Sequence, residues 1–457
     1  MIKRSCGEIA KMCGGELLGG AAAAVCGVCT DTRKITQGNL FVPIYGERFD
    51  GHDYLETAEK NGAAAAFWTA GRAVPKSDMP LILVDDTVKA LGRLAAAYRN
   101  ELSARFIGIT GSNGKTSTKD FLAGILSAKY KTGKTMGNLN NHIGMPLTIL
   151  SFDEDTQMAV VEMGTSDFGE IDYLASILRP DAAILANVGE AHLDKLISVE
   201  GVAKAKLEMV PYISKNGLFI YFGDQIVLKK AFAACTCPCA VKTFGESSDC
   251  DLRLSDVSAQ GDSIEFTTAG LINGSFTLGS PGRHNALNAL AAMLAADFMG
   301  LSADEIAQGF TLIEKTKMRN EIISIGNITI LNDAYKSNPA SVRAALNTFY
   351  DLEGTRKLFV MGDMIELGPT ARELHSEIGH IIDEQQIDAV YAYGPDSAYC
   401  IEAASKRFSS GKALHFNDRD RLVDAVAEYC NEPCALLFKA SRALKFEELI
   451  EKLRKKI

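Results

Sequence analysis

Residues 108–116 read Gly-Ile-Thr-Gly-Ser-Asn-Gly-Lys-Thr and join an apolar run to a helical pattern. In such a loop the glycines let backbone N–H groups close on phosphates, the lysine reaches the β- and γ-phosphate oxygens, and the threonine hydroxyl can ligate Mg²⁺. The pattern departs from a Walker A motif, because Ile109 stands where that motif has glycine. The segment predicts a strand–loop–helix unit that binds ATP or GTP. The predicted contacts are Gly111, Ser112, Asn113, Gly114, Lys115 and Thr116.

The composition is that of an ordinary folded protein. A chain of 457 residues has room for roughly two to four domains. Its net charge of −9 argues against a nucleic-acid partner, which requires a basic surface. The 11 cysteines form no pairable framework, which favours free thiols in a reducing compartment over disulfides or a zinc site. No apolar run approaches the ~18–20 residues of a membrane span, so we expect a soluble cytoplasmic protein.

Apolar runs and helical patterns alternate along the chain in three blocks, with boundaries near residues 105 and 317. Continuous apolar runs are typical of parallel strands buried on both faces of a sheet, so we predict an α/β protein. The third block in particular has a doubly wound pattern. The predicted strands cover residues 39–44, 63–68, 81–84, 158–161, 182–186, 217–222, 358–361, 389–393 and 435–438, and predicted helices cover residues 91–102 and begin near residue 285.

Chemically active side chains follow the strands of the central block. Glu162 ends one apolar run, and because ligands of open α/β sheets bind beyond the carboxyl ends of strands, we expect it near the Mg²⁺ of the loop. His192 follows the next run, where it can ligate a metal or contact phosphate, and Lys206 lies on a helical stretch beyond it. Each has an ordinary alternative: a capping glutamate, a structural histidine, a solvated lysine. Together they indicate a site for two metal ions and a triphosphate.

Two amides, Asn285 and Asn288, lie one helical turn apart on one face of the next predicted helix. An amide offers both a donor and an acceptor, which matches the edge of an adenine. In the third block polar segments follow apolar strands at residues 332–341, 361–368 and 439–442. Turn chemistry is the alternative explanation for these segments, since Asn, Asp, Ser and Gly are the usual turn residues.

This ordered set of motifs resembles the Mur ligases, the ATP-dependent amide-forming enzymes of peptidoglycan synthesis. The resemblance covers nearly the whole chain. The segments that carry it lie at residues 31–33, 50–52, 110–116, 137–141, 162–164, 169–171, 187–192, 203–208, 282–285, 363–368 and 439–442.

The resemblance implies three domains: a uridine-nucleotide-binding domain in residues 1–104, a central P-loop ATPase-type domain in residues 105–317, and a C-terminal Rossmann-like domain in residues 318–457. It implies that Thr116 and Glu162 hold one Mg²⁺, and that His192 and a carbamylated Lys206 hold a second. Lys115, Lys206 and His192 are the expected catalytic residues. Asn285, Asn288, Arg319 and Asp333 are expected to position ATP, and Asp31, Thr32, Arg33, Asp50, Gly51, His52, Asn138, Asn140 and Asn141 the nucleotide-linked substrate.

The segments Asp-Ala-Tyr and Asp-Met-x-Glu-Leu-Gly resemble most closely the member that joins D-alanyl-D-alanine to UDP-N-acetylmuramoyl-tripeptide. We therefore expect those two substrates, an acyl-phosphate intermediate and a monomer. The alternatives are a Mur ligase that adds a single third amino acid, folylpolyglutamate synthase, and, from another class, a nucleotide switch or kinase-like phosphotransferase. The chain departs from the family pattern at Lys336, Ser337 and Ala440, and across residues 165–168.

Overall fold

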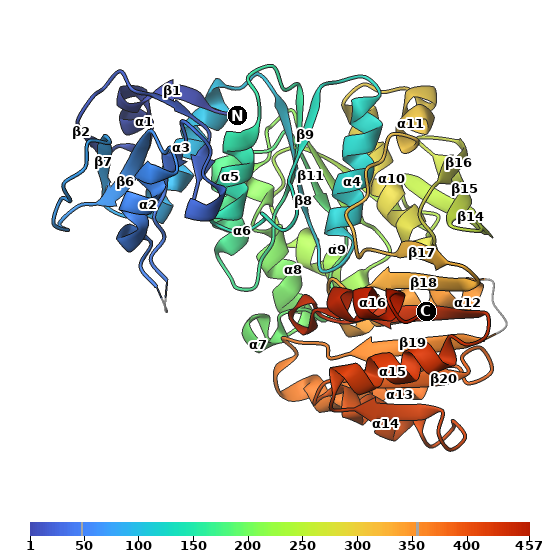
Figure 1. Ribbon diagram of the computed structural model, residues 1–457. Helices are drawn as coiled ribbons and strands as arrows, with labels where there is room; N and C mark the ends of the chain where they lie inside the picture. The colour runs from blue at the N-terminus through green and yellow to red at the C-terminus, as the bar shows by residue number, and fades with distance from the viewer. Residues whose placement is uncertain (47–48, 353–355) are drawn as a thin grey trace.

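Three lobes make up the molecule (Figure 1), which we describe from a computed structural model covering residues 1–46, 49–352 and 356–457. The N-terminal lobe holds a five-stranded sheet in the order β2-β7-β6-β5-β4, with a two-stranded sheet of β1 and β3 beside it. Its strands are β1 (Lys3–Ser5), β2 (Glu16–Leu18), β3 (Ala24–Cys26), β4 (Val28–Cys29), β5 (Leu40–Phe41), β6 (Ala65–Thr69) and β7 (Leu81–Val84), and its helices are α1 (Cys6–Cys13), α2 (Leu55–Lys60) and α3 (Thr87–Glu101).

The central lobe is built on a nine-stranded sheet in the order β16-β15-β14-β13-β12-β11-β8-β10-β9. The seven neighbouring strands β14, β13, β12, β11, β8, β10 and β9 run parallel, so their carboxyl ends meet at one edge of the sheet. Strand β8 lies between β10 and β11, which places the loop after β8 between the ends of both. The strands are β8 (Arg105–Thr110), β9 (Thr132–Lys134), β10 (Met158–Glu162), β11 (Ala182–Leu185), β12 (Leu218–Phe222), β13 (Ala240–Gly245), β14 (Leu252–Gln260), β15 (Ser263–Gly270) and β16 (Gly274–Leu278).

The antiparallel meander β14–β15–β16 is a departure from the strand–helix alternation predicted for this block. Strand β15 alternates buried and partly exposed residues along its length, so one face packs on the core and the other meets solvent. The prediction relied on continuous apolar runs, which one-sided strands do not have. The helices of the lobe are α4 (Lys115–Ser127), α5 (Gly144–Ser151), α6 (Glu170–Leu178), α7 (Leu193–Leu196), α8 (Val199–Leu207), α9 (Ile226–Ala233), α10 (Arg283–Phe298) and α11 (Ala303–Phe310).

The C-terminal lobe holds a six-stranded sheet in the order β17-β18-β22-β19-β20-β21, parallel except for the β17–β18 pair. Helices cover both faces, the doubly wound arrangement that the sequence predicts. Its strands are β17 (Glu321–Ile325), β18 (Ile328–Asp333), β19 (Lys357–Gly362), β20 (Ala389–Tyr393), β21 (Ala413–Phe416) and β22 (Cys434–Lys439), and its helices are α12 (Pro339–Asp351), α13 (Ala371–Ile381), α14 (Ser397–Ala404), α15 (Arg419–Tyr429) and α16 (Phe446–Arg454).

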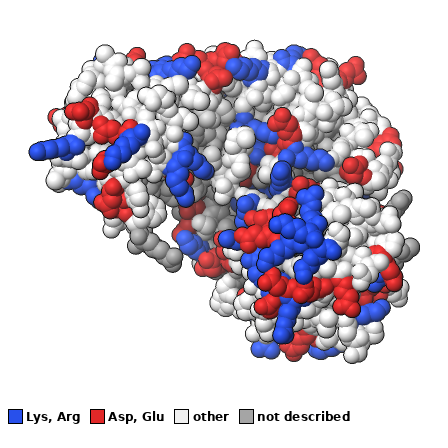
Figure 2. Space-filling model, viewed as in Figure 1, with Lys and Arg blue, Asp and Glu red and all other residues white. Residues whose placement is uncertain are grey.

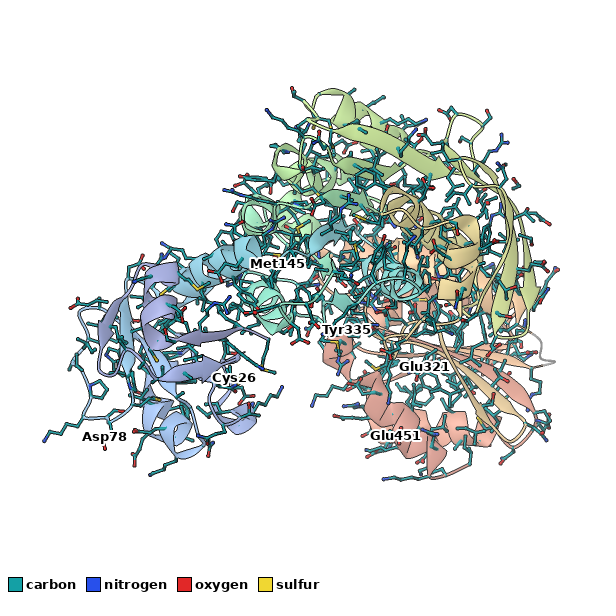
Figure 3. The ribbon with its side chains drawn as sticks, turned by 90° about the horizontal axis from the view of Figure 1, so that it is seen from above. Cys26, Asp78, Met145, Glu321, Tyr335 and Glu451 are labelled. Atoms are coloured by element: carbon teal, nitrogen blue, oxygen red, sulfur yellow. The ribbon has the colours of Figure 1, made fainter. Side chains whose placement is uncertain are left out.

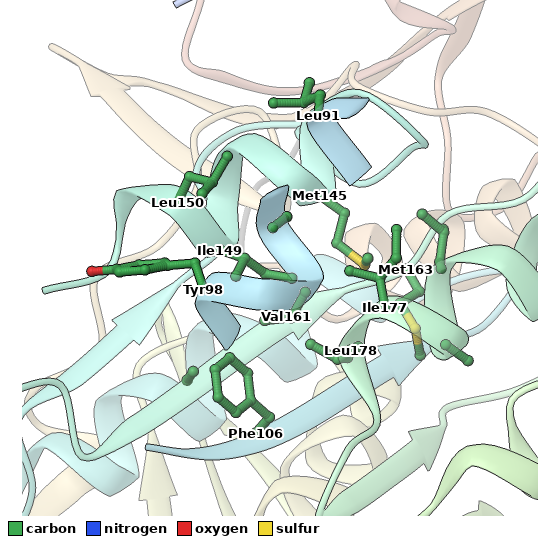
Figure 4. Packing of buried hydrophobic residues seen from close by; sticks show 14 of the residues in the cluster. Leu91, Tyr98, Phe106, Met145, Ile149, Leu150, Val161, Met163, Ile177 and Leu178 are labelled. Carbon is green, nitrogen blue, oxygen red and sulfur yellow. The ribbon is translucent and has the colours of Figure 1, made fainter. Parts of the chain in front are cut away.

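The N-terminal and central lobes share one hydrophobic core. Leu91 and Tyr98 of α3 pack with Met145 and Ile149 of α5, all fully buried (Figure 4). The Tyr98 hydroxyl donates to the Phe152 carbonyl oxygen at 2.9 Å, so its polar end is also satisfied. By contrast, the two buried clusters of the C-terminal lobe contain only residues of that lobe.

The lobes leave a hollow on the face shown in Figure 2, between the N-terminal and C-terminal lobes. Lys and Arg side chains are interspersed with Asp and Glu over the lower part of that face. Within the described residues, no helix is both long and apolar enough to cross a membrane.

Candidate active site

The loop after β8 turns tightly into α4 at Gly114, which has a left-handed backbone with φ 76°. A Cβ built there would lie 2.3 Å from Oδ1 of Asn288, so a side chain is excluded on both counts. The Lys115 ammonium folds back and donates to the Gly111 carbonyl oxygen at 2.6 Å. The predicted strand–loop–helix unit is therefore present, with its lysine inside the loop.

Burial, together with the nearby Lys336 and Arg319, lowers the pKa of Lys115 to about 7, although Glu162 acts in the other direction. Desolvation penalises a charged amine that lacks an anionic partner. A phosphate placed in the loop would supply that partner and restore the charge. The electrostatics of the loop therefore point to an anionic ligand.

Thr116 and Glu162 come together beside the loop, as the sequence predicts. The Thr116 hydroxyl donates to Oε2 of Glu162 at 3.0 Å, and the Asn140 amide donates to Oε1 at 2.8 Å. Glu162 is only 2% exposed and has no lysine or arginine in ion-pair contact among the described residues. A buried carboxylate beside a hydroxyl is a donor set that suits Mg²⁺.

The loop itself is held by the segment after β11. The backbone N–H of Asn113 donates to the Asn187 side-chain oxygen at 2.9 Å, and the Asn187 amide donates back to the Asn113 carbonyl oxygen at 3.0 Å. The Gly189 N–H donates to the Ser112 hydroxyl at 3.0 Å. These contacts fix the loop in shape before any ligand binds.

The C-terminal lobe meets the loop through polar side chains. The Asn338 amide donates to Oδ1 of Asn113 at 2.9 Å, and Arg319 donates to the Thr116 hydroxyl at 3.4 Å. The Arg319 guanidinium also lies 4.1 Å above the Tyr335 ring. Figure 3 places Tyr335 where the C-terminal lobe adjoins the central lobe.

His192 contacts the C-terminal lobe with both ring nitrogens. Its Nδ1 lies 3.0 Å from Oε2 of Glu366, and its Nε2 lies 3.0 Å from the Lys336 amine. Burial lowers the pKa of His192, although Glu366 acts in the other direction. We assign a neutral ring with its proton on Nδ1, because Nε2 accepts from Lys336.

Lys206 is buried on α8, with 2% of its surface exposed. Burial, with Lys115 and Lys336 nearby, holds the pKa of its amine well below the usual range. No hydrogen bond links Lys206 to His192 within the described part of the chain. The two predicted ligands of a second ion are thus near the same lysines but not joined to each other.

A cavity of about 220 Å³ opens beside the loop between the central and C-terminal lobes. Asn288 lines it, whereas Asn285 turns away and donates to the Pro281 carbonyl oxygen at 2.7 Å. Of the expected pair, only Asn288 therefore faces a ligand. Asp333 also lines the cavity, where Oδ2 pairs with the Lys439 ammonium at 2.9 Å.

The residues expected to hold the nucleotide-linked substrate in the N-terminal lobe are internally paired. Asp31 binds the Arg33 guanidinium at 2.9 Å, and Asp50 binds the ring of the buried His52 at 2.7 Å. Gly51 lies tight against Ile44, and Thr32 lies in a short 3₁₀ helix. No hydrogen bond or ion pair joins any of these to the loop after β8 within the described ranges.

The three asparagines after β9 differ in their contacts. Asn140 reaches Glu162, as described above. The Asn141 side chain accepts from the N–H of Gly144, the first residue of α5, at 2.8 Å, while Asn138 is exposed.

Lys336, Asn338 and Glu366 received no role from the sequence, although each lies in a segment that it singled out. Each follows the end of a strand, β18 or β19, of the C-terminal sheet. Their pairing with Asn113 and His192 spans up to 225 positions along the chain. Such contacts depend on how two lobes meet, which no local pattern reports.

Comparison with known proteins is decisive at this point. Three family models match: "Mur ligase family, catalytic domain" over residues 24–99, "Mur ligase middle domain" over residues 109–296, and "Mur ligase, glutamate ligase domain" over residues 318–442. The chain belongs to the Mur ligase family. As a Mur ligase it is an ATP-dependent ligase.

Individual relatives match nearly the whole length of the chain. The UDP-N-acetylmuramoyl-tripeptide–D-alanyl-D-alanine ligase of Bacillus subtilis is 42% identical, over 99% of both chains. A crystal structure of MurF from Acinetobacter baumannii superposes with a TM-score of 0.91 at 28% identity, covering 100% of this chain and 99% of the other. MurF ligase from Thermotoga maritima, solved in complex with ADP, matches with a TM-score of 0.81 at 27% identity, over 94% and 97%.

Proposed function

We propose that this ligase joins D-alanyl-D-alanine to the free carboxyl group of UDP-N-acetylmuramoyl-tripeptide, with ATP as the energy source. The observation that carries the proposal is the closure of a phosphate loop by polar side chains of a second lobe, in a chain similar over its full length to enzymes of that name. The same similarity favours this activity over addition of a single amino acid.

The reaction has two chemical steps. The peptide carboxylate attacks the γ-phosphorus of ATP, an O–P bond forms, the bond to the β-phosphate oxygen breaks, and ADP leaves. The dipeptide amine then attacks the acyl carbon, a C–N bond forms, and inorganic phosphate leaves with the amine proton going to solvent. Lys115 and Arg319 neutralise charge on the transferred group, and loop N–H groups orient it.

An acyl phosphate hydrolyses if water reaches it, so the site must exclude solvent between the two steps. The contacts of Asn338 with Asn113 and of Lys336 with His192 lie where they would close it. We propose that the C-terminal lobe opens to admit substrates and closes for chemistry, with the segment 314–320 as a hinge.

One magnesium ion fits this site. Thr116 and Glu162 would hold it, and when bound it would neutralise phosphate oxygens. A second ion would be held by Nε2 of His192, whose opposite ring nitrogen faces Glu366, and by a carbamylated Lys206, with the Lys336 amine displaced from Nε2. The depressed pKa of Lys206 leaves the neutral amine, which is the form that adds CO₂ to give a carbamate.

We propose a division of labour by segment. Residues 1–104 bind the uridine nucleotide, with Asp31–Arg33 and Asp50–His52 on its loops and Asn138–Asn141 at its border. Residues 105–317 bind ATP, and residues 318–457 complete the acceptor and phosphate sites. Because one chain supplies all of these groups, we propose a monomer, acting in the cytoplasm.

The test is competition among acceptors. The enzyme is given ATP, Mg²⁺, supplied UDP-peptides and an equal mixture of D-alanyl-D-alanine, D-glutamate and diaminopimelate, and the products are identified by mass spectrometry. We expect a mass increase of one dipeptide on the tripeptide substrate. Addition of one amino acid instead would overturn the assignment.

A further inference from the structure

The linker between the central and C-terminal lobes is anchored to the central lobe at Asp120. This residue lies on α4, the helix that follows the phosphate loop, and is 3% exposed. Its Oδ2 accepts from the backbone N–H of Thr316 at 2.9 Å. Its Oδ1 accepts from the Lys134 ammonium at 3.0 Å, and Lys134 also donates to the Glu314 carbonyl oxygen at 2.9 Å. One carboxylate and one ammonium therefore hold this part of the linker in place.

The anchor is buried, and its charges are paired with one another. Lys119 is 1% exposed, and its ammonium lies 3.4 Å from Oδ1 of Asp120. A buried carboxylate is stable where cations and N–H donors replace the water it has lost. Packing adds to the anchor just upstream, since a Cβ built on Gly124 of α4 would lie 2.9 Å from the Ile313 Cα. The linker therefore runs against α4 from residue 313 to residue 316.

The other end of the linker is bound to the C-terminal lobe. The backbone N–H of Met318 donates to Oε2 of Glu321 at 2.9 Å, and the Asn332 amide of β18 donates to the same oxygen at 3.1 Å. Glu321 begins β17, where the C-terminal lobe adjoins the central lobe (Figure 3). The N–H of Asn320 donates to Oδ1 of Asp333 at 3.3 Å. The chain from Met318 onward therefore moves with the C-terminal lobe.

Lys317 is the one residue between these two anchors. It is exposed, and its neighbours Thr316 and Met318 are held by different lobes. A rotation of the C-terminal lobe is therefore concentrated in the backbone dihedrals around Lys317. Arg319 follows soon after this pivot and donates to the Thr116 hydroxyl at 3.4 Å. The arm that carries the Arg319 guanidinium into the site is therefore short.

We propose that Asp120 is a positioning residue: by fixing the linker to the phosphate-loop helix, it returns Arg319 to the transferred phosphoryl group each time the C-terminal lobe closes. The contacts form a closed ring. Thr116 and Asp120 lie one helical turn apart on α4, and they contact Arg319 and Thr316 of the linker, respectively. The inference rests on the proposed phosphoryl transfer, and it adds the element that makes closure reproducible.

Loss of the anchor would lengthen the free part of the linker from residue 317 alone to residues 314–317. The free-energy cost of closing a flexible chain grows as 3/2 RT times the logarithm of its length. A segment about four times as long therefore lowers the effective concentration of Arg319 at the loop by roughly eightfold. The groups that bind ADP and the UDP-tripeptide stay as they are. We therefore expect slower phosphoryl transfer without weaker binding.

The first test compares two ways of freeing the linker: Asp120→Ala, and an insertion of three glycines after Lys317 that leaves every buried group in place. Phosphate release is measured with saturating ATP, UDP-tripeptide and D-alanyl-D-alanine, and ADP affinity by calorimetry. Each change should lower kcat by roughly eightfold, with KM for the UDP-tripeptide and ADP affinity unchanged. Combined, they should cost only about twofold more than either alone, because both lengthen the same segment.

Two matched controls should leave kcat unchanged: Asp304→Ala, at an exposed position of α11, and three glycines inserted after Gly411, in an exposed turn of the C-terminal lobe. An unchanged kcat in Asp120→Ala or in the insertion after Lys317 would overturn the proposal. So would an equal loss of ADP affinity, since that would indicate damage to the whole site. If Asp120→Ala does not fold, Asp120→Asn has the same shape but one acceptor oxygen in place of two, and it is measured in the same way.

The second test asks whether Asp120 acts through Arg319. Single-turnover rates, which remain measurable in slow variants, are determined with enzyme in excess for Arg319→Ala with and without Asp120→Ala. Without the guanidinium there is nothing left to position, so Asp120→Ala should cost less than about twofold in this background. A further eightfold loss there would show that Asp120 acts on something else, and would overturn the proposal.

The third test needs no substrate. Hydrogen exchange of the Thr316 backbone N–H is followed by mass spectrometry with residue resolution in the ligand-free chain. We expect protection that is lost in Asp120→Ala, because the carboxylate accepts from this N–H. Fast exchange in the unmodified chain would overturn the proposal. A wrong acceptor assignment would leave this result unaffected and would show instead as absent turnover of the unmodified enzyme with the supplied dipeptide.

Discussion

The two junctions of the central lobe are built differently. The N-terminal lobe joins it through a shared apolar core, in which Tyr98 and Met145 are fully buried. The C-terminal lobe joins it through hydrogen bonds between polar side chains, such as Asn113 with Asn338. Apolar burial is lost whenever a junction opens, whereas polar groups exchange partners with water at small net cost. The first junction is therefore permanent, and the second is suited to repeated opening.

The substitution Lys115→Ala gives the largest expected difference between the chemistry at the polar junction and substrate binding beside the apolar one. We expect phosphate release to fall by about a thousandfold or more, since the cation acts on the developing charge of the transition state. Binding of the UDP-tripeptide, measured by calorimetry without ATP, should stay nearly unchanged. Equal loss of both would contradict the idea that only the polar junction carries the chemistry.

The substitution Tyr98→Ala removes a buried ring from the apolar junction between the N-terminal and central lobes. It should lower the free energy of unfolding by about 3–5 kcal/mol, the usual cost of removing a buried aromatic ring, as measured by denaturant titration. Tyr98→Phe is the control: it keeps the ring and loses only the hydrogen bond to the Phe152 carbonyl oxygen, for about 1 kcal/mol. A Tyr98→Ala protein as stable as Tyr98→Phe would show that the shared core does not bind the lobes.

The substitution Asn338→Ser weakens the polar junction. Serine still caps α12, as the Asn338 side chain does by accepting from the Ser341 N–H, but it removes the amide pair with Asn113. We expect kcat/KM to fall by roughly fivefold, equivalent to about 1 kcal/mol, with the unfolding midpoint unchanged. A drop in stability with normal turnover would reverse the roles given to the two junctions.

The smallest effect expected is a pH dependence at His284, whose Nε2 accepts from the Asn320 amide across the polar junction at 2.8 Å. Burial lowers the pKa of His284, so the folded chain holds this ring neutral at a pH where the unfolded chain protonates it. Its stabilising contribution is complete above the unfolded pKa of about 6.5 and is lost as the pH falls below it. The thermal unfolding temperature should therefore fall less steeply between pH 7.5 and 5.5 in His284→Gln than in the unmodified protein. Parallel slopes for both proteins would argue against this assignment.

Much of the fold follows from local pattern. Strands at residues 81–84 and 389–393 have the predicted bounds, and most others differ by a residue or two at their ends, but the strand predicted at residues 39–44 is only Leu40–Phe41. The β14–β16 meander was missed because its strands are apolar on one face. The alternation Ile264, Phe266, Thr268 in β15 is the signal that would have found it.

Within the site, the sequence predicts those contacts that follow from the order of the strands in the central sheet. Thr116 and Glu162 meet because β8 and β10 are parallel neighbours, so the ends of both strands lie at one edge. Two features could not be predicted: the Asn285 side chain points away from the cavity and binds the Pro281 carbonyl oxygen, and Lys336 contacts His192. The first depends on a local donor–acceptor match at the start of α10, and the second on the approach of two lobes.

The Asn113–Asn338 pair has a consequence for behaviour in salt. Neither amide carries a charge, so added electrolyte does not screen their attraction. The half-exposed Arg343 and Glu190, 3.7 Å apart at the same junction, are charged and would be weakened. Closure that depends on the amides is then insensitive to ionic strength, so a change in salt concentration would not change how firmly the C-terminal lobe covers the site.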